Sequence, residues 1–183
     1  MSKRYKGIVA RARFNFAQCV FNHQVFEFAA RREKRKENLL KTANLLLTIL
    51  SLAALIDRGQ TYWLNILGQY TVVAEIVLQL AQWSFDIGNL SAEHERTAKE
   101  YLMLREEYGC LLAEVEESKM NNDELSRRYR DLANRYSTIC KMSHQTTNKD
   151  YEKAGEWLSH GNRKTDSSEA YTWSDDEIDA FLP

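Results

Sequence analysis

Hydrophobic residues recur every three or four positions along most of the chain, which is the pattern of amphipathic α-helices. In residues 5–36 they form two parallel stripes, and an apolar face this wide needs more than one neighbouring helix to cover it. The first stripe contains Val9, Ala12, Phe16, Cys19, His23 and Phe26, and the second contains Phe14, Ala17, Phe21, Val25 and Phe28.

The same spacing returns in the polar second half of the chain. Residues 101–115 and residues 125–139 each carry an apolar residue every three or four positions. Asn121 stands three residues before Glu124, an arrangement typical of a helix start, and Asn89 or Ser91 is a candidate cap for the helix before it. We expect two helices joined by a short turn, packed in a bundle with the N-terminal helix.

Between these amphipathic segments lie two mainly apolar ones. Residues 42–56 contain no charge, residues 57–61 form a predicted turn around Gly59, and residues 62–87 make a second apolar arm. A turn this short permits only an antiparallel helical hairpin. The chain has only 7 glycines and 1 proline, so we predict an all-α fold.

Polar side chains interrupt the second arm at helical spacing. Glu75, Gln79, Gln82 and Asp86 are separated by 4, 3 and 4 residues, which places them on one narrow stripe. An acid in an apolar membrane helix is costly unless it faces protein or water. We therefore predict that this stripe lines a water-filled pathway when several hairpins assemble. The alternative is the wet face of a bundle outside the membrane.

Small and mildly polar residues mark a predicted contact between the arms. Asn44, Thr48 and Ser51 fall on one face of the first arm, and Gly68 continues the polar stripe of the second. Helices in lipid use such residues to approach one another closely. In a bundle outside the membrane the same face would be the half-exposed side of a core helix.

Charge is distributed unevenly, although the net charge is only −1. Residues 1–41 hold eleven Lys or Arg against three acids, while residues 161–183 hold six acids against two bases. Cations precede the first arm and follow the second, and few lie between the arms. This distribution favours a membrane hairpin whose two flanking segments both lie in the cytoplasm. The cations expected at the lipid headgroups, or otherwise at a solvated helix end, are Arg31, Arg32, Lys34, Arg35, Lys36 and Lys41.

Motifs of catalysis are missing from the sequence, so neither an enzyme nor a cofactor is expected. Three dispersed cysteines argue against a disulfide framework. Cys19 with His23, and Cys140 with His144, could each offer two metal ligands, but two ligands do not make a zinc site, and none is predicted. The aromatic stripes of the basic N-terminal helix are too regular for base stacking, which argues against nucleic acid.

Residues 92–104 (AEHERTAKEYLML), residues 129–136 (YRDLANRY) and the pair Asp150 and Tyr151 resemble the SLATT domains. These are bacterial two-transmembrane effectors associated with nucleotide-signalling conflict systems, and the resemblance covers roughly residues 15–154. It implies an oligomeric pore or membrane-disrupting effector in the bacterial inner membrane. It also implies a sensor or nucleotide-synthase partner that triggers depolarisation during phage infection.

The sequence thus predicts a basic cytoplasmic helix at residues 1–38, a transmembrane hairpin at 39–88, a cytoplasmic helical hairpin at 89–158 and a flexible acidic tail at 159–183. The expected partners are membrane lipid and further copies of the chain. A soluble helical adaptor is the alternative function. An enzyme or metalloprotein built on the Cys/His pairs is a third.

Overall fold

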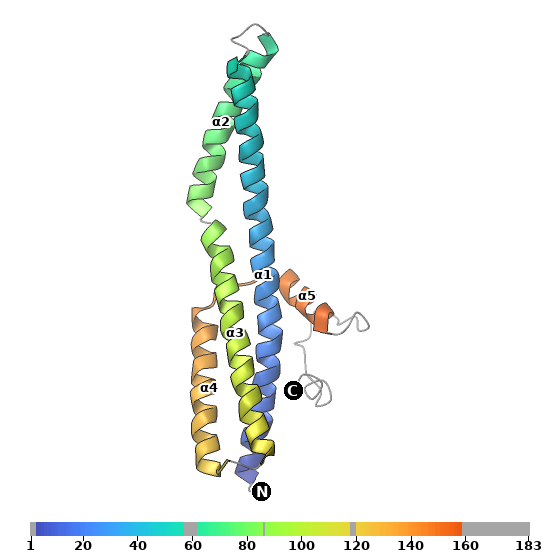
Figure 1. Cartoon of the computed structure of the whole chain (residues 1–183), viewed down its shortest axis with the longest axis vertical. Helices are drawn as coiled ribbons and strands as arrows, with labels where there is room; N and C mark the ends of the chain where they lie inside the picture. The colour runs from blue at the N-terminus through green and yellow to red at the C-terminus, as the bar shows by residue number, and fades with distance from the viewer. Residues whose placement is uncertain (1–2, 57–61, 86, 118–119, 159–183) are drawn as a thin grey trace. The chain divides into compact units, whose positions relative to one another are not determined.

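The computed structural model describes residues 3–56, 62–85, 87–117 and 120–158 (Figure 1). Helices dominate these residues, and no strand occurs among them. This confirms the all-α prediction. In chain order the helices are α1 (Lys3–Ile56), α2 (Tyr62–Phe85), α3 (Ile87–Glu116), α4 (Asn122–Met142) and α5 (Asn148–Leu158).

α1 continues through the basic cluster at residues 31–36, where the sequence pattern predicts the end of a helix. No glycine or proline occurs between Gly7 and the end of α1, so nothing in this stretch breaks the backbone pattern. Ion pairs three or four residues apart also connect successive turns here, as between Lys34 and Glu37 and between Glu37 and Lys41. The basic cluster is therefore part of one continuous helix.

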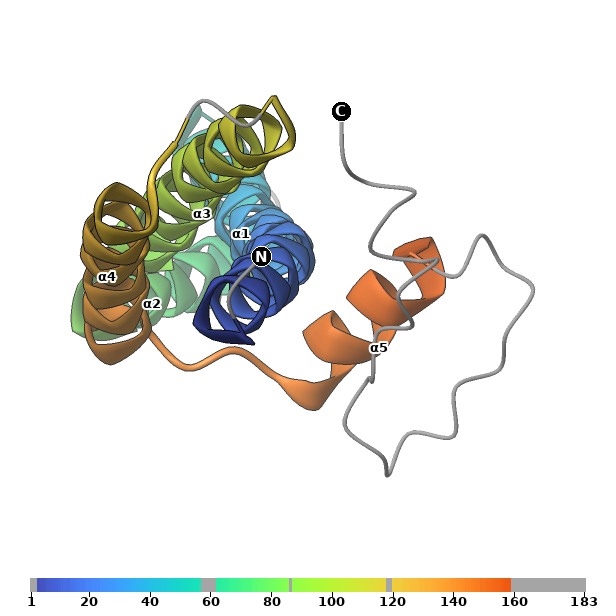
Figure 2. The same cartoon turned by 90° about the horizontal axis from the view of Figure 1, so that it is seen from below.

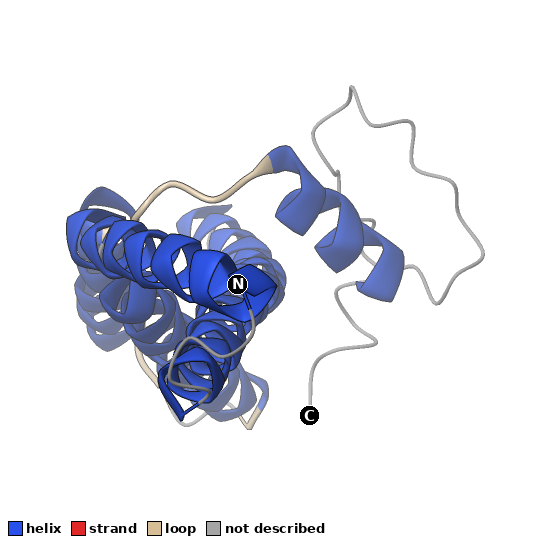
Figure 3. Cartoon of the chain, turned by 90° about the horizontal axis from the view of Figure 1, so that it is seen from above, coloured by secondary structure: helices blue, strands red, loops and turns tan. Residues whose placement is uncertain are grey.

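The chain divides into two compact units, and α1 and α3 contribute to both. Unit 1 comprises Met1–Ala29 and Glu93–Pro183, and unit 2 comprises Ala30–Ala92. Within unit 1, α1, α3 and α4 pack side by side, and α5 lies across α1 from α4 (Figures 2 and 3). The expected bundle of the N-terminal helix with two later helices is confirmed.

The core of unit 1 is built from the apolar repeats of the sequence. Tyr101, Leu104, Tyr108 and Leu111 of α3 are at most 2% exposed. They pack against buried residues of α1 and α4, with partly buried Tyr129, Tyr136 and Ile139 at the margin. Hydroxyl groups within this apolar interior need partners. Tyr108 and Tyr136 find them in Asn15 and Asn22, whose amides donate at 3.1 Å.

The N-terminal starts of α3 and α4 test the two predicted helix caps, and only the one at α4 is correct. Asn121 caps α4, since its side chain accepts hydrogen bonds from the backbone N–H groups of Asp123 and Glu124. Neither Asn89 nor Ser91 caps α3, because that helix already begins at Ile87. The Ser91 hydroxyl is buried instead and donates to the Ala30 carbonyl at 3.1 Å.

α5 lies in a polar region where the sequence pattern predicts no helix. Its start is stabilised by Asp150, whose carboxylate accepts hydrogen bonds from both the backbone N–H and the hydroxyl of Thr147. Ala154 and Leu158 are buried, and the ring of Tyr151 lies 6.0 Å from that of Phe21 on α1. α5 is therefore part of the folded unit. The expected acidic tail at residues 159–183 lies outside the described residues.

Candidate functional site

In unit 2 two polar contacts join the arm of α1 at residues 39–56 to α2. The Thr48 hydroxyl donates to the carboxylate of Glu75, with 2.5 Å between the oxygens. One turn along, Ser51 Oγ lies 3.0 Å from Thr71 Oγ1. Thr71 is only 6% exposed, so this second contact is shielded from solvent. Polar side chains thus bridge the two arms.

Gly68 brings the backbones of the arms close together beside these contacts. A Cβ added at Gly68 would lie 2.5 Å from the Cβ of Ala54, a separation that real Cβ atoms essentially never show. The Thr71 hydroxyl also donates to the Gly68 carbonyl at 2.9 Å. We call the set Thr48, Ser51, Ala54, Gly68, Thr71 and Glu75 the hairpin seam. Three of the four residues predicted for helix contact, Thr48, Ser51 and Gly68, lie in it.

The apolar side chains of the same arms point outward. In a protein whose surroundings are water, the large apolar residues gather inside and polar groups cover the surface. Unit 2 has the opposite arrangement, with polar bridges between its arms and many exposed apolar side chains around them. On α1 these are Leu39, Leu45, Leu46, Ile49, Leu50, Leu52 and Ile56, and on α2 Tyr62, Trp63, Leu67, Tyr70, Val72, Val73, Ile76, Val77 and Leu80.

The predicted polar stripe of α2 is divided between the seam and the surface. Glu75 is half-buried at the seam and Gln79 is exposed. Gln82 is half-buried, and its Nε2 has no hydrogen-bond partner among the described residues. The same is true of Asn44 Oδ1 on the α1 arm. Asp86 lies outside the described residues.

The expectation of two membrane-spanning helices meets a direct test in these arms. Across residues 3–56, 62–85, 87–117 and 120–158, no helix has both the length and the apolar character needed to cross a membrane. Asn44, Thr48 and Ser51 lower the hydropathy of the first arm, and Glu75, Gln79 and Gln82 lower that of the second.

The predicted membrane-flank cations surround two acids that the sequence analysis did not single out. Glu33 is only 4% exposed, and it pairs with Arg32 at 2.8 Å and Lys36 at 2.9 Å. Burial alone would raise the pKa of Glu33. The hydrogen bonds and charges of Lys36 and Arg32 outweigh it and lower that pKa below the usual 4.5.

Glu37 joins two further cations of this cluster. It pairs with Lys34 at 3.0 Å and Lys41 at 2.5 Å, and these hydrogen bonds, Lys41 first, lower its pKa. The side chains of Arg31 and Arg35 are exposed. The cluster is thus a network of opposite charges. The spacing of Glu33 and Glu37 from the surrounding Lys residues was the sequence signal for it.

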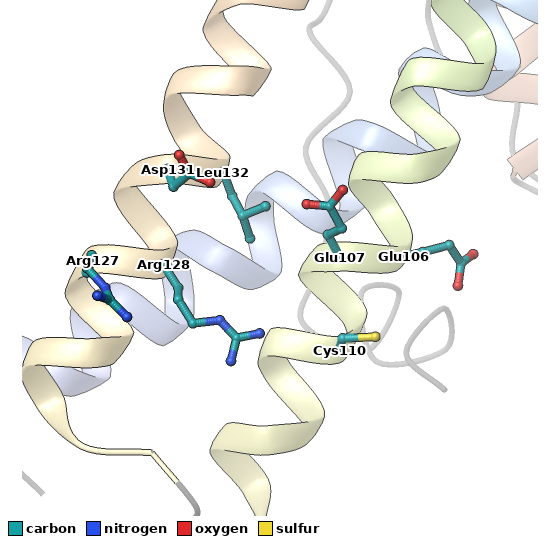
Figure 4. Close-up of a pocket in the computed structure, with 7 residues that line it drawn as sticks. All are labelled: Glu106, Glu107, Cys110, Arg127, Arg128, Asp131 and Leu132. Atoms are coloured by element: carbon teal, nitrogen blue, oxygen red, sulfur yellow. The ribbon is translucent and has the colours of Figure 1, made fainter.

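A crevice between α3 and α4 in unit 1 is also lined by charged residues (Figure 4). It has a volume of about 470 Å³. Arg128 crosses from α4 to Glu114 on α3 with two hydrogen bonds, at 2.5 and 3.1 Å, and Arg135 pairs with Glu107. These ion pairs bind the two helices together. The lining residues are Glu106, Glu107, Cys110, Arg127, Arg128, Asp131 and Leu132.

The two Cys/His pairs are placed in other interactions. Cys19 is fully buried, and burial, followed by the nearby Cys140, raises its pKa well above the usual 9.0. His23 Nδ1 lies 3.0 Å from the Ala98 carbonyl oxygen, and Cys140 Sγ lies 3.2 Å from the Tyr101 hydroxyl. Among the described residues no three His, Cys, Asp or Glu side chains are grouped to hold a metal ion.

Comparison with known proteins identifies the family. The model of the SMODS and SLOG-associating 2TM effector domain family 4 matches residues 9–170, which is most of the chain. The chain belongs to this SLATT family. The resemblance seen in the sequence is confirmed. No curated protein and no solved structure matches this SLATT chain.

Proposed function

We propose that this SLATT protein is a membrane effector of a bacterial defence system, and that its hairpin at residues 39–88 assembles into a pore in the inner membrane. The observation that carries the proposal is the arrangement of unit 2, with polar contacts inside and apolar side chains outside. Such a surface in water would be an unusually large exposed apolar patch. In lipid it is the favourable arrangement, because lipid contacts apolar groups and polar groups pair within the protein.

The lengths of the arms support insertion when charged ends reach the headgroups. Residues 39–56 form about 27 Å of helix and α2 about 36 Å, at roughly 1.5 Å per residue. The hydrocarbon core of a bilayer is about 30 Å thick. The six predicted flank cations, Arg31, Arg32, Lys34, Arg35, Lys36 and Lys41, precede or begin the first arm, where anionic lipid would attract them. Both termini would then lie in the cytoplasm.

An oligomer would give the polar stripe of the hairpin a function. Thr48 and Glu75 belong to the seam, and Gln79 lies on the exposed surface of α2; all three are exposed or half-buried in the single chain. Asn44 Oδ1 and Gln82 Nε2 are buried without a hydrogen-bond partner among the described residues, at a cost of about 1–3 kcal/mol each. Water in a lumen shared by several hairpins would hydrate these groups. Asp86 completes the proposed lining.

The family description also supports a protein partner that controls the pore. It names association with SMODS and SLOG, which points to nucleotide signalling. We propose that a sensor or nucleotide-synthase protein of such a system triggers assembly of the hairpins. Ion flow through the pore would then depolarise the infected cell.

The proposed pore-lining role of Glu75 is tested by replacing this acid with an apolar residue. Glu75→Leu removes the charge at the seam, so we expect vesicles containing the variant to retain the protein and to lose ion flux. Gln69→Leu is the matched control, because Gln69 is exposed on α2 away from the stripe. Unchanged flux through the Glu75→Leu protein would refute the pore-lining role.

A further inference from the structure

A second surface of interest lies in unit 1, near the start of the chain. A groove of about 370 Å³ separates the N-terminal parts of α1 and α4. It combines two cationic side chains with an isoleucine and a tyrosine, as a site for an acidic and aromatic peptide would. The lining residues are Gly7, Ile8, Arg11, Ser126, Tyr129 and Arg130.

The groove has open space beside Gly7. A Cβ added at Gly7 would meet no atom within 4 Å. Arg11 and Arg130 are both exposed, and Ile8 and Tyr129 are half-buried beside them. The groove therefore offers apolar contact area next to accessible positive charge.

The electrostatic field around the α1 side of the groove is positive. The chain has five cations and no acid between its start and Glu27. On α4 the acids nearest in sequence to the groove residues are Glu124, two residues before Ser126, and Asp131, directly after Arg130. Asp131 lines the crevice on the α3 side of this helix. An anionic segment is therefore attracted to the α1 wall.

The chain itself contains a segment of complementary composition. Residues 171–182 hold four acids and no base, interleaved with Tyr171, Trp173 and Phe181. They follow the end of α5 at Leu158 after a connection of twelve residues, 159–170. An extended chain of that length reaches roughly 40 Å. Tyr151 of α5 contacts Phe21, which is thirteen residues or roughly 20 Å along α1 from Ile8. The segment thus has the charge, the aromatic groups and the reach to occupy the groove.

We propose that residues 171–182 dock into the groove between α1 and α4 of the same chain. The acids of the segment pair with Arg11 and Arg130, and an aromatic side chain packs against Ile8 and Tyr129. Docking ties the acidic end of the chain to unit 1 and excludes an acidic partner from the same groove. The proposal does not depend on membrane insertion or on a pore.

Photocrosslinking in the full-length protein tests this docking. Phe181 is replaced by the photoreactive aromatic p-benzoylphenylalanine, and crosslinked peptides are mapped by mass spectrometry. We expect crosslinks within one chain to peptides containing residues 7–11 or 126–130. The yield should fall about fivefold in Arg11→Glu/Arg130→Glu, since two attractions become repulsions, and should also fall as salt is raised.

Two further variants separate docking from a general loss of structure. Asp176→Lys/Asp179→Lys should restore the yield in the Arg11→Glu/Arg130→Glu protein, because it reverses the charges on the other side. Gly7→Leu should lower the yield by filling the groove, with unchanged helix content, since space is open there. Lys141→Glu is the control, a charge reversal at the opposite end of α4.

Three results would overturn the proposal. The first is crosslinks that map to other surfaces of the protein. The second is a yield that does not respond to reversal of the groove charges. The third is covalent dimers in place of crosslinks within one chain, which would assign the groove to the tail of a second copy.

Discussion

The close approach of the hairpin arms makes Gly68→Ala an informative perturbation. Its new Cβ would lie 2.5 Å from the Cβ of Ala54, and ordinary contact begins at 3.4 Å, so the arms must separate by about 0.9 Å. Overpacking of this kind costs about 1–3 kcal/mol. In an isolated helix the same change would be favourable by about 1 kcal/mol. The sign of the effect therefore reports whether the arms are in contact.

The assay measures the arm-to-arm contact directly. Ser51 and Thr71 face each other across the seam at 3.0 Å, so both are changed to Cys in a chain whose exposed Cys110 and Cys140 are Ser. Equilibration with a glutathione redox buffer gives the effective concentration of the two thiols. The effect of Gly68→Ala on helix propensity is the same in the reduced and oxidised forms, so it cancels from their ratio. The remaining effect is the steric clash between the arms.

Gly68→Ala should lower this effective concentration at least about fivefold, because each 1.4 kcal/mol is a factor of about ten. Adding Ala54→Gly removes the opposing Cβ and should restore the value to within about twofold. Gly109→Ala is the control, because a Cβ there would sit 3.6 Å from Phe16, which is ordinary contact. An unchanged value in Gly68→Ala, or a failed rescue by Ala54→Gly, would refute the proposed packing of the arms.

Two further predictions concern titratable groups. Cys19 is buried and its pKa is raised, whereas Cys110 and Cys140 are exposed. A thiol reagent at neutral pH should therefore label two cysteines in the folded chain and three after unfolding, and rapid native labelling of Cys19 would contradict the burial. Folding lowers the pKa of Glu33, so the ion pairs of Glu33 stabilise unit 2 above about pH 4.5. This stabilisation is lost as the pH falls through the lowered pKa of Glu33 in the folded chain. Thermal unfolding followed below pH 4.5 should show a steeper loss of stability in the wild-type chain than in Glu33→Gln, and identical profiles would contradict this.

The sequence predicted the elements whose signals are local. The cap at Asn121 depends on residues within one turn, and the repeat from Tyr101 to Leu111 has the period of one helix face. The continuity of α1 was missed because the cations at residues 31–36 looked like a boundary. Glu33 and Glu37 pair those charges along the helix, which allows it to continue.

The interior of the hairpin seam depends on more than the pattern of one helix. Thr48, Ser51 and Gly68 were visible as small or polar residues, but Ala54 and Thr71 become important only through the register of one arm against the other. That register is set by close packing between distant segments, which periodicity does not encode. The pattern of apolar residues did not predict α5 for another reason. Its start depends on a hydrogen bond from the Thr147 hydroxyl to the Asp150 carboxylate, within a polar segment.

The central claim is that the hairpin at residues 39–88 is embedded in a membrane. Its most direct test is alkaline carbonate extraction of bacterial membranes after low-level expression of the full-length protein. The account predicts that the protein stays with the membrane, because the apolar exterior of both arms would be covered by lipid. Release into the aqueous fraction would contradict the claim and favour a helical adaptor that uses the same surface to bind protein.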